Sequence, residues 1–178
     1  MRVLLEQVRK APVEWREDLE LSPEQVEGSN LLDLSVVECG GRLSAVADGI
    51  LIQGALRYQQ TLSCGRCLEP VTLPVDESFD LLAVSPAEEP EIAEELELEQ
   101  SDLDVVTVEG EELDTDPLVV EQVRLNVPMK PLCSEQCRGL CPRCGNNLNQ
   151  GSCECPASDG DPRWSRLAAL RDRSLDRG

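Results

Sequence analysis

Alternation between apolar and polar side chains is the clearest signal in the first half of the chain. Between Ile50 and Tyr58 every second residue is apolar or glycine, with polar side chains such as Arg57 between them. The same period returns from Val71 to Leu81. A period of two places alternate side chains on opposite faces of a strand. The two segments therefore predict an antiparallel β-meander with one face exposed to solvent.

Two glycine-containing segments upstream predict turns. Apolar residues alternate over 32–36 and again over 43–47. Gly40-Gly41 is therefore expected to turn the chain between two strands. Asp48-Gly49 follows the second of them and favours a tight hairpin, because these residue types tolerate positive φ angles.

The first 30 residues carry weaker signals. Val3–Val8 and Val13–Leu21 are expected to be extended. Ser22 is suited to cap a helix that begins at Pro23, and Gln25 would complete a capping box. That helix can only be short, because glycine, serine and asparagine follow it.

Two further helices are predicted in the second half, each opened by an Asp-Pro pair. Asp116 is expected to cap the first and Pro117 to start it, since proline gives up only an N–H that would have no partner there. Valines then recur at helical spacing up to Val127. Asp161-Pro162 predicts a C-terminal helix in the same way.

Charge is distributed unevenly along the 178 residues. The chain has 35 acidic and 16 basic residues, a net charge of −19, which argues against non-specific binding to nucleic acid through neutralised phosphates. Residues 85–116 contain 14 of the acidic residues and no basic one. We interpret this stretch mainly as a solvated segment, mobile over 85–102. Its alternative role is to attract a basic partner.

The composition excludes several classes of function. The chain contains no histidine, which removes Ser-His-Asp and Cys-His nucleophile pairs and mixed cysteine–histidine zinc fingers. No stretch approaches the roughly 20 apolar residues of a transmembrane helix, and the N-terminus lacks the apolar core of a secretory signal. We therefore expect a cytoplasmic protein without membrane association. In that reducing compartment cysteines are thiols or metal ligands rather than disulfides.

Eight of the nine cysteines form four close pairs, each able to supply half of a tetrahedral four-thiolate site. Two structural zinc ions are therefore predicted. The run from Cys141 to Gly145 is typical of a zinc knuckle, because a glycine permits a tight exit from the turn. The predicted ligands are Cys64, Cys67, Cys133, Cys137, Cys141, Cys144, Cys153 and Cys155.

Spacing alone leaves three ways to combine the four pairs. We favour a site made of the last two pairs, because closing the eight-residue loop between them costs little chain entropy. The other site would then tie Cys64 and Cys67, at the end of the β-meander, to Cys133 and Cys137. An alternative joins the second pair to the third and leaves Cys64 and Cys67 to a chemistry of their own.

The remaining cysteine interpretations concern reactivity. Cys64-Gly65-Arg66-Cys67 could be a redox pair, but such pairs normally begin at a helix N-terminus, and this one lies between predicted strands with Pro70 close behind. Cys39 has no nearby cysteine in the sequence. We expect it to be a small buried apolar side chain.

The predicted fold class is α+β: an antiparallel β-sheet or meander with two short helices and a zinc-stapled, cysteine-rich C-terminal segment. Residues 1–84 are expected to form the antiparallel β core, and 85–102 the acidic mobile insertion. Residues 103–132 would complete the core with a hairpin, turned at Glu109-Gly110, and a helix. Residues 133–178 would contain the zinc segment and the C-terminal helix.

The cysteine pairs and their flanks also resemble a known family. The chain resembles the YceD-type proteins, the large ribosomal RNA subunit accumulation proteins, in three successive features. These are Cys64-x2-Cys67-Leu68-Glu69-Pro70, the acidic stretch that follows, and the run from Pro131 through Cys133-x3-Cys137 and Cys141-x2-Cys144 to Asn149. The segment from Asp161 to Leu170 resembles the end of the same pattern.

The resemblance implies a non-enzymatic ribosome-biogenesis factor that supports the synthesis, processing or stability of 23S rRNA and assembly of the large subunit. No catalytic residues and no small-molecule substrate are implied. The partner would be the pre-ribosomal large-subunit particle, through 23S rRNA or a basic ribosomal protein. The alternative is a thiol redox or zinc-dependent sensor acting through Cys64 and Cys67. Candidate contacts to RNA or a partner are the basic residues that flank the cysteine-rich tail and its helix, among them Arg138, Arg143, Arg163 and Arg166.

Overall fold

A computed structural model describes residues 1–26, 30–86 and 104–155. The chain divides into two units, Met1–Cys137 and Arg138–Gly178. Residues 87–102 of the predicted acidic insertion lie outside the described part of the chain, as does the predicted C-terminal helix.

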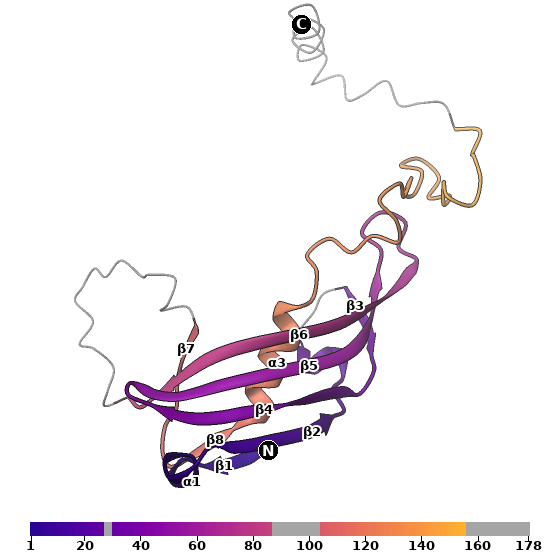
Figure 1. The fold of residues 1–178 in the computed structure, drawn as a ribbon. Helices are drawn as coiled ribbons and strands as arrows, with labels where there is room; N and C mark the ends of the chain where they lie inside the picture. Colours follow the sequence, from indigo (N-terminus) through magenta and orange to yellow (C-terminus); the bar gives the residue numbers. More distant parts are fainter. Residues whose placement is uncertain (27–29, 87–103, 156–178) are drawn as a thin grey trace, which may run out of the picture. The chain divides into compact units, whose positions relative to one another are not determined.

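The first unit is built on a six-stranded sheet (Figure 1). Neighbouring strands β2, β4, β5 and β6 are all antiparallel, and the short β3 pairs with β5 beyond the end of β4. The outermost β7 runs parallel to β6, so the sheet is a meander with one parallel edge. The strands are β2 (Val13–Leu19), β3 (Leu31–Leu34), β4 (Val37–Val46), β5 (Gly49–Ser63), β6 (Pro70–Val84) and β7 (Val105–Thr107).

A two-stranded sheet and, among the described residues, three helices complete this unit. Helix α3 lies across one face of the main sheet (Figure 1), where Val119 and Val123 are fully buried. The hydroxyl of Tyr58 on β5 donates a hydrogen bond to the carbonyl of Val123 over 3.4 Å. The elements are β1 (Arg2–Leu4), α1 (Leu5–Lys10), α2 (Pro23–Val26), β8 (Glu112–Asp114), paired with β1, and α3 (Thr115–Leu125).

The predicted alternation on β5 is confirmed. Its even-numbered residues from Ile50 to Leu62 are buried on one face of the sheet, while the odd-numbered residues are exposed or partly exposed. The predicted hairpin forms, but its turn lies one residue earlier than expected: Val46 pairs with Gly49, so Ala47 and Asp48 make the turn and Gly49 opens β5. Gly49 has a φ of +150°, whereas Asp48 does not adopt the positive φ expected of it. The buried face of the long β5–β6 pair supplies a large part of the hydrophobic core.

The turn predicted at Gly40-Gly41 is wrong, because both glycines lie within β4. A Cβ added to Gly41 would lie 1.9 Å from the carbonyl oxygen of Gln53 on β5. The missing side chain therefore allows two strands to approach closely, a second use of glycine in sheets. The predicted alternation of residues 32–36 also fails, since Leu32 and Val36 are 52% and 45% exposed whereas Leu31 and Val37 are buried.

Three further local predictions are corrected. Val3–Val8 is not one extended piece, because α1 begins at Leu5; its residues are good helix formers, and Lys10 donates to Glu6 one turn earlier over 2.5 Å. The hairpin predicted around Glu109-Gly110 does not form, since β7 and β8 belong to different sheets. Helix α3 is capped by Asp114, whose carboxylate accepts from the backbone N–H of Asp116.

Candidate metal centres

The first group of cysteines joins the turn between β5 and β6 to the segment that follows α3. Cys64 and Cys67 lie in the turn, and Cys133 and Cys137 come from the later segment. The four sulfur atoms all lie within 4.8 Å of one another. Three of these side chains are almost fully buried, and Cys133 is exposed.

The sulfur spacing fits a tetrahedral ion better than a disulfide. The Sγ atoms of Cys64 and Cys137 are 3.9 Å apart, and those of Cys67 and Cys133 are 3.6 Å apart. A zinc–sulfur bond of about 2.3 Å gives a tetrahedron with edges of about 3.8 Å. Disulfide-bonded sulfurs lie about 2.05 Å apart. The group could therefore hold a metal ion with little movement of the chain.

Hydrogen bonds connect the two halves of the first group. The N–H of Gly65 donates to the carbonyl of Pro131 over 2.8 Å. The guanidinium of Arg66 donates to the carbonyls of Glu135 and Cys137, over 3.1 and 2.8 Å. The sequence did not predict that Arg66 positions this segment. Only its location between two cysteines could have indicated such a role.

The pKa values in this group reflect crowding of the four sulfurs. Burial opposes ionisation of Cys64, but backbone N–H groups of Cys67, Arg66 and Cys133 point at its sulfur and lower its pKa to about 6. The neighbouring Cys137 and Cys67 side chains raise the pKa of Cys133 to about 12. Four thiols this close cannot all ionise alone, and a divalent cation is the chemistry that would relieve their repulsion.

The second group lies within the second unit and uses the two remaining pairs. The sulfurs of Cys141, Cys144, Cys153 and Cys155 also lie within 4.8 Å of one another. Cys141 is buried and the other three are partly or fully exposed. Backbone N–H groups of Cys144 and Arg143 lower the pKa of Cys141 to about 6, while the neighbouring Cys144 is the main cause that raises the pKa of Cys155 to about 12.

The two turns that open these groups have the same backbone pattern. In the first, the N–H of Leu68 donates to the carbonyl of Cys64; in the second, the N–H of Gly145 donates to that of Cys141. The residue after the second cysteine is left-handed in both, with φ of +62° at Leu68 and +74° at Gly145. The glycine therefore has the role expected of it, and Leu68 adopts the same conformation although its side chain disfavours it.

The structure thus forms the two groups favoured by the short-loop interpretation. That they bind zinc stays a prediction. Cys64 and Cys67 lie between two strands, as expected, rather than at a helix N-terminus. Cys39 is buried, its thiol donates to the carbonyl of Glu17 over 3.3 Å, and burial is the main cause that raises its pKa to about 11.

The predicted arginine contacts are only partly described. Arg138 and Arg143 are exposed in the second unit, and the N–H of Arg138 donates to the side-chain oxygen of Asn149 over 2.8 Å. Arg163 and Arg166 lie outside the described residues. Their role in binding RNA or a protein stays a prediction.

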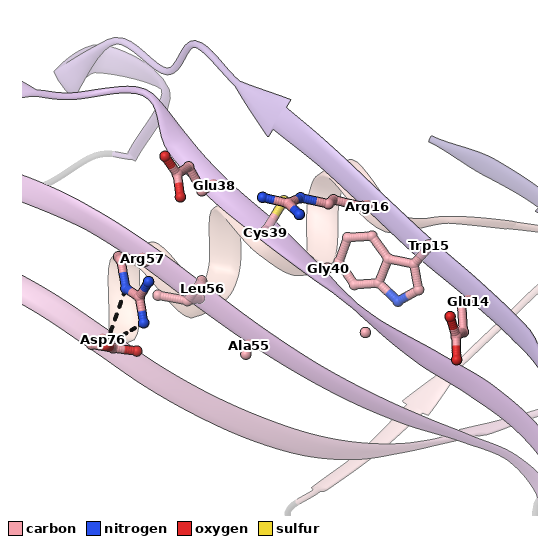
Figure 2. A pocket seen from close by; sticks show the side chains of 11 residues that line it. Glu14, Trp15, Arg16, Glu38, Cys39, Gly40, Ala55, Leu56, Arg57 and Asp76 are labelled. Carbon is pink, nitrogen blue, oxygen red and sulfur yellow. Dashed lines mark hydrogen bonds and ion pairs between the residues drawn. The ribbon is translucent and has the colours of Figure 1, made fainter.

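A shallow hollow of about 520 Å³ lies over β2, β4, β5 and β6 (Figure 2). Glu14, Arg16 and Glu38 line it, and the side chains of Arg57 and Asp76 form an ion pair of 2.7 Å at its margin. The one thiol in the lining belongs to Cys39. With a pKa of about 11, that thiol is a poor nucleophile at neutral pH.

Comparison with known proteins shows that part of the chain matches the sequence model of a protein family. The sequence model described as "Large ribosomal RNA subunit accumulation protein YceD" matches residues 52–171, a range that contains both cysteine groups. No solved structure matches the chain. Among the described residues, no helix is long and apolar enough to cross a membrane.

Individual relatives come from bacteria and plants. A Mycobacterium tuberculosis protein is 30% identical over 153 residues, which cover 82% of this chain and 64% of the relative. The Bacillus subtilis protein YlbN is 28% identical over 93% of this chain and 92% of its own length. An Arabidopsis thaliana protein named "Large ribosomal RNA subunit accumulation protein YCED homolog 1, chloroplastic" is 28% identical over 68% of this chain and 44% of its own length.

Proposed function

The chain belongs to the YceD family of large ribosomal RNA subunit accumulation proteins, and on that premise we propose that it is a non-enzymatic factor for large-subunit assembly. It would support the synthesis, processing or stability of 23S rRNA. The observation that carries the proposal is the family match over residues 52–171, which includes all eight paired cysteines. A cytoplasmic location fits this role and would keep those thiols reduced.

We further propose that each cysteine group binds one zinc ion with a structural role. All four ligand positions of each tetrahedron would be filled by protein sulfurs, which is typical of structural rather than catalytic zinc. The ion in the first group would fix the segment after α3 against the β5–β6 turn. The ion in the second group would fix the loop carrying Arg138 and Arg143.

The partner would be the pre-ribosomal large-subunit particle, contacted through 23S rRNA or a basic ribosomal protein. A net charge of −19 favours the protein contact, because an acidic surface repels phosphates and attracts lysine and arginine. The exposed arginines of the second unit would supply any local contact to RNA.

The second candidate is a redox or zinc-dependent sensor. It is favoured by the pKa of Cys64, which is lowered to about 6 and is therefore in the range of reactive cysteines. Cys64 is fully buried, however, which restricts access by a reaction partner. Metal content of the untagged protein separates the candidates: two zinc ions per chain support structural centres, whereas one ion or none, together with a reactive thiol, supports a redox role.

A complementation experiment tests the assembly role. A strain lacking the gene would be supplied with the wild-type protein, with a Cys64→Ser and Cys141→Ser double variant, or with Cys39→Ala as the matched control. We expect the double variant to accumulate less 23S rRNA than the control, with large-subunit precursors in the sedimentation profile. Normal 23S rRNA in the strain without the gene, with no co-sedimentation of the protein with precursors, would contradict the proposal.

A further inference from the structure

Strand β6 has a long edge without a neighbouring strand in the described part of the chain. The strand extends over Pro70–Val84, but β7 pairs only with Leu82, Ala83 and Val84. Figure 1 shows β6 at the margin of the sheet, with β7 beside its end. The edge preceding Leu82 is therefore open among residues 1–26, 30–86 and 104–155.

The hairpin between β4 and β5 identifies which backbone groups point to that edge. In a two-residue hairpin the closing pair, here Val46 and Gly49, exchanges both hydrogen bonds, and bonded pairs then alternate. The backbone N–H and C=O groups of odd-numbered β5 residues therefore point toward β4 and β3. The hydrogen bond from the N–H of Ser35 to the carbonyl of Gln59 agrees with this. Even-numbered residues of β5 bond to odd-numbered residues of β6, such as Val75 opposite Tyr58.

The even-numbered residues of β6 therefore direct their N–H and C=O groups outward. The bond from the N–H of Val108 to the carbonyl of Val84 agrees with this phase. Pro74 is also at such a position, where proline removes no bond to β5. Between Pro74 and Leu82, the outward donors are the N–H groups of Asp76, Ser78 and Asp80.

A hollow of about 430 Å³ lies directly beside this edge, between β6, β7 and α3. Its apolar lining includes Phe79, the 38% exposed Val105 and the 70% exposed Leu125. Its charged lining is entirely acidic, namely Asp80, Asp104 and Glu121. An added strand would project alternate side chains toward this hollow and toward the outer face of β6, where Asp76 lies.

We propose that the open edge of β6 from Thr72 to Asp80, with the acidic hollow beside it, binds an extended lysine- or arginine-rich segment of another protein as an added β-strand. Acidic residues along the edge disfavour pairing with a second copy of this chain and favour a basic guest. The proposal is independent of the ribosomal role, since it depends only on this edge and its charge.

Hydrogen exchange of the full-length protein tests the edge directly. In the free protein, amides of Asp76, Ser78 and Asp80 should exchange at least about tenfold faster than those of Glu77 and Phe79, which bond to β5. A peptide of about ten residues, alternately lysine and valine, should slow the three edge amides at least about tenfold. A peptide with glutamate in place of lysine should leave them unchanged.

Backbone variants separate strand addition from simple charge attraction. Ser78→Pro removes one outward N–H, and Ser78→Ala is the matched control that keeps it; the proline variant should bind the basic peptide about tenfold more weakly. A peptide N-methylated at alternate residues should lose affinity to a similar degree. Leu125→Lys, at a 70% exposed position, gives a second variant that should weaken binding by repulsion in case the proline variant fails to fold.

Two results would overturn the proposal. Equal affinity for the methylated and unmodified peptides would show that charge alone attracts the peptide. Slow exchange of the three edge amides in the free full-length protein, lost on deletion of residues 87–103, would show that the chain's own segment occupies the edge.

Discussion

Each cysteine group begins with a turn of the same backbone conformation, but the two groups connect different parts of the chain. In the first group the sulfurs of Cys67 and Cys133 lie 3.6 Å apart although the residues are separated by 66 positions, and three of the four side chains are almost fully buried. In the second group an eight-residue loop separates the two cysteine pairs, and only Cys141 is buried. The first is thus a long-range connection within the β core, and the second organises a short local segment. The same ligand set can therefore contribute very differently to stability.

The largest effect is expected from breaking the first group. Cys64→Ser removes a buried ligand, and by analogy with a cross-link that closes a loop of this length it should lower the unfolding free energy of the first unit by about 4 kcal/mol. Chemical denaturation with and without a chelator would measure this. A wild-type protein whose stability is unaffected by metal removal would show that the two units do not depend on an ion.

A smaller and more local effect is expected from the second group. Cys141→Ser should abolish binding of one of two ions and abolish the order of residues 138–155, because a structural ion supplies folding free energy to a short segment directly. The unfolding free energy of the first unit should change by less than about 0.5 kcal/mol, since distant sites are usually additive. Metal analysis and an NMR spectrum resolve the two effects. Loss of both ions would contradict the independence of the groups.

The left-handed residue that follows the second cysteine is Leu68 in the first turn and Gly145 in the second, so each can be replaced by the residue type of the other. Leu68→Gly should raise the stability of the first unit by about 0.5 to 1 kcal/mol, because the relief of left-handed strain exceeds the extra entropy of glycine in the unfolded chain. Leu68 is 64% exposed, so little packing is lost. Gly145→Leu should weaken metal binding by the second group by about tenfold. Opposite signs for the two variants are the decisive result.

The smallest effect is expected at Cys39, which lies outside both groups. Cys39→Ala should retain both ions and lower stability by about 1 kcal/mol. In the native protein at pH 8, a pKa of about 11 leaves only about one Cys39 thiol in a thousand ionised. Alkylation followed by mass spectrometry should find Cys39 unmodified until the protein unfolds. Rapid modification of the folded protein would contradict its assignment as a core residue.

The sequence predicted those parts of the fold whose signals are local and periodic. Alternation from Ile50 to Leu81 reflects burial of one sheet face, so it identified β5, β6 and the hairpin before them. Pairing across the sheet left no such signal. The parallel contact of β7 with β6 joins segments separated by residues 87–103, and nothing in the sequence of Val105–Thr107 distinguishes a parallel from an antiparallel partner.

The candidate metal centres were predictable for a similar reason. Paired cysteines have few other uses in a reducing compartment, and loop entropy favoured one pairing over the others. The supporting contacts were not predictable, because Arg66 donates to carbonyls that any residue type would present. Gly41 shows the opposite problem: glycine suits both turns and close strand contacts, and only the neighbouring Gln53 carbonyl decides between them.

The guanidinium of Arg66 has a consequence for the order in which the protein matures. Its hydrogen bonds to the carbonyls of Glu135 and Cys137 connect the β5–β6 turn to the segment that carries the other two cysteines of the first group. If the group binds zinc as proposed, the four thiols would be brought together before the ion arrives. The loop of Cys153 and Cys155 would instead depend on the ion for its conformation. In cells with little available metal, the first unit would therefore fold while the second stayed unstructured.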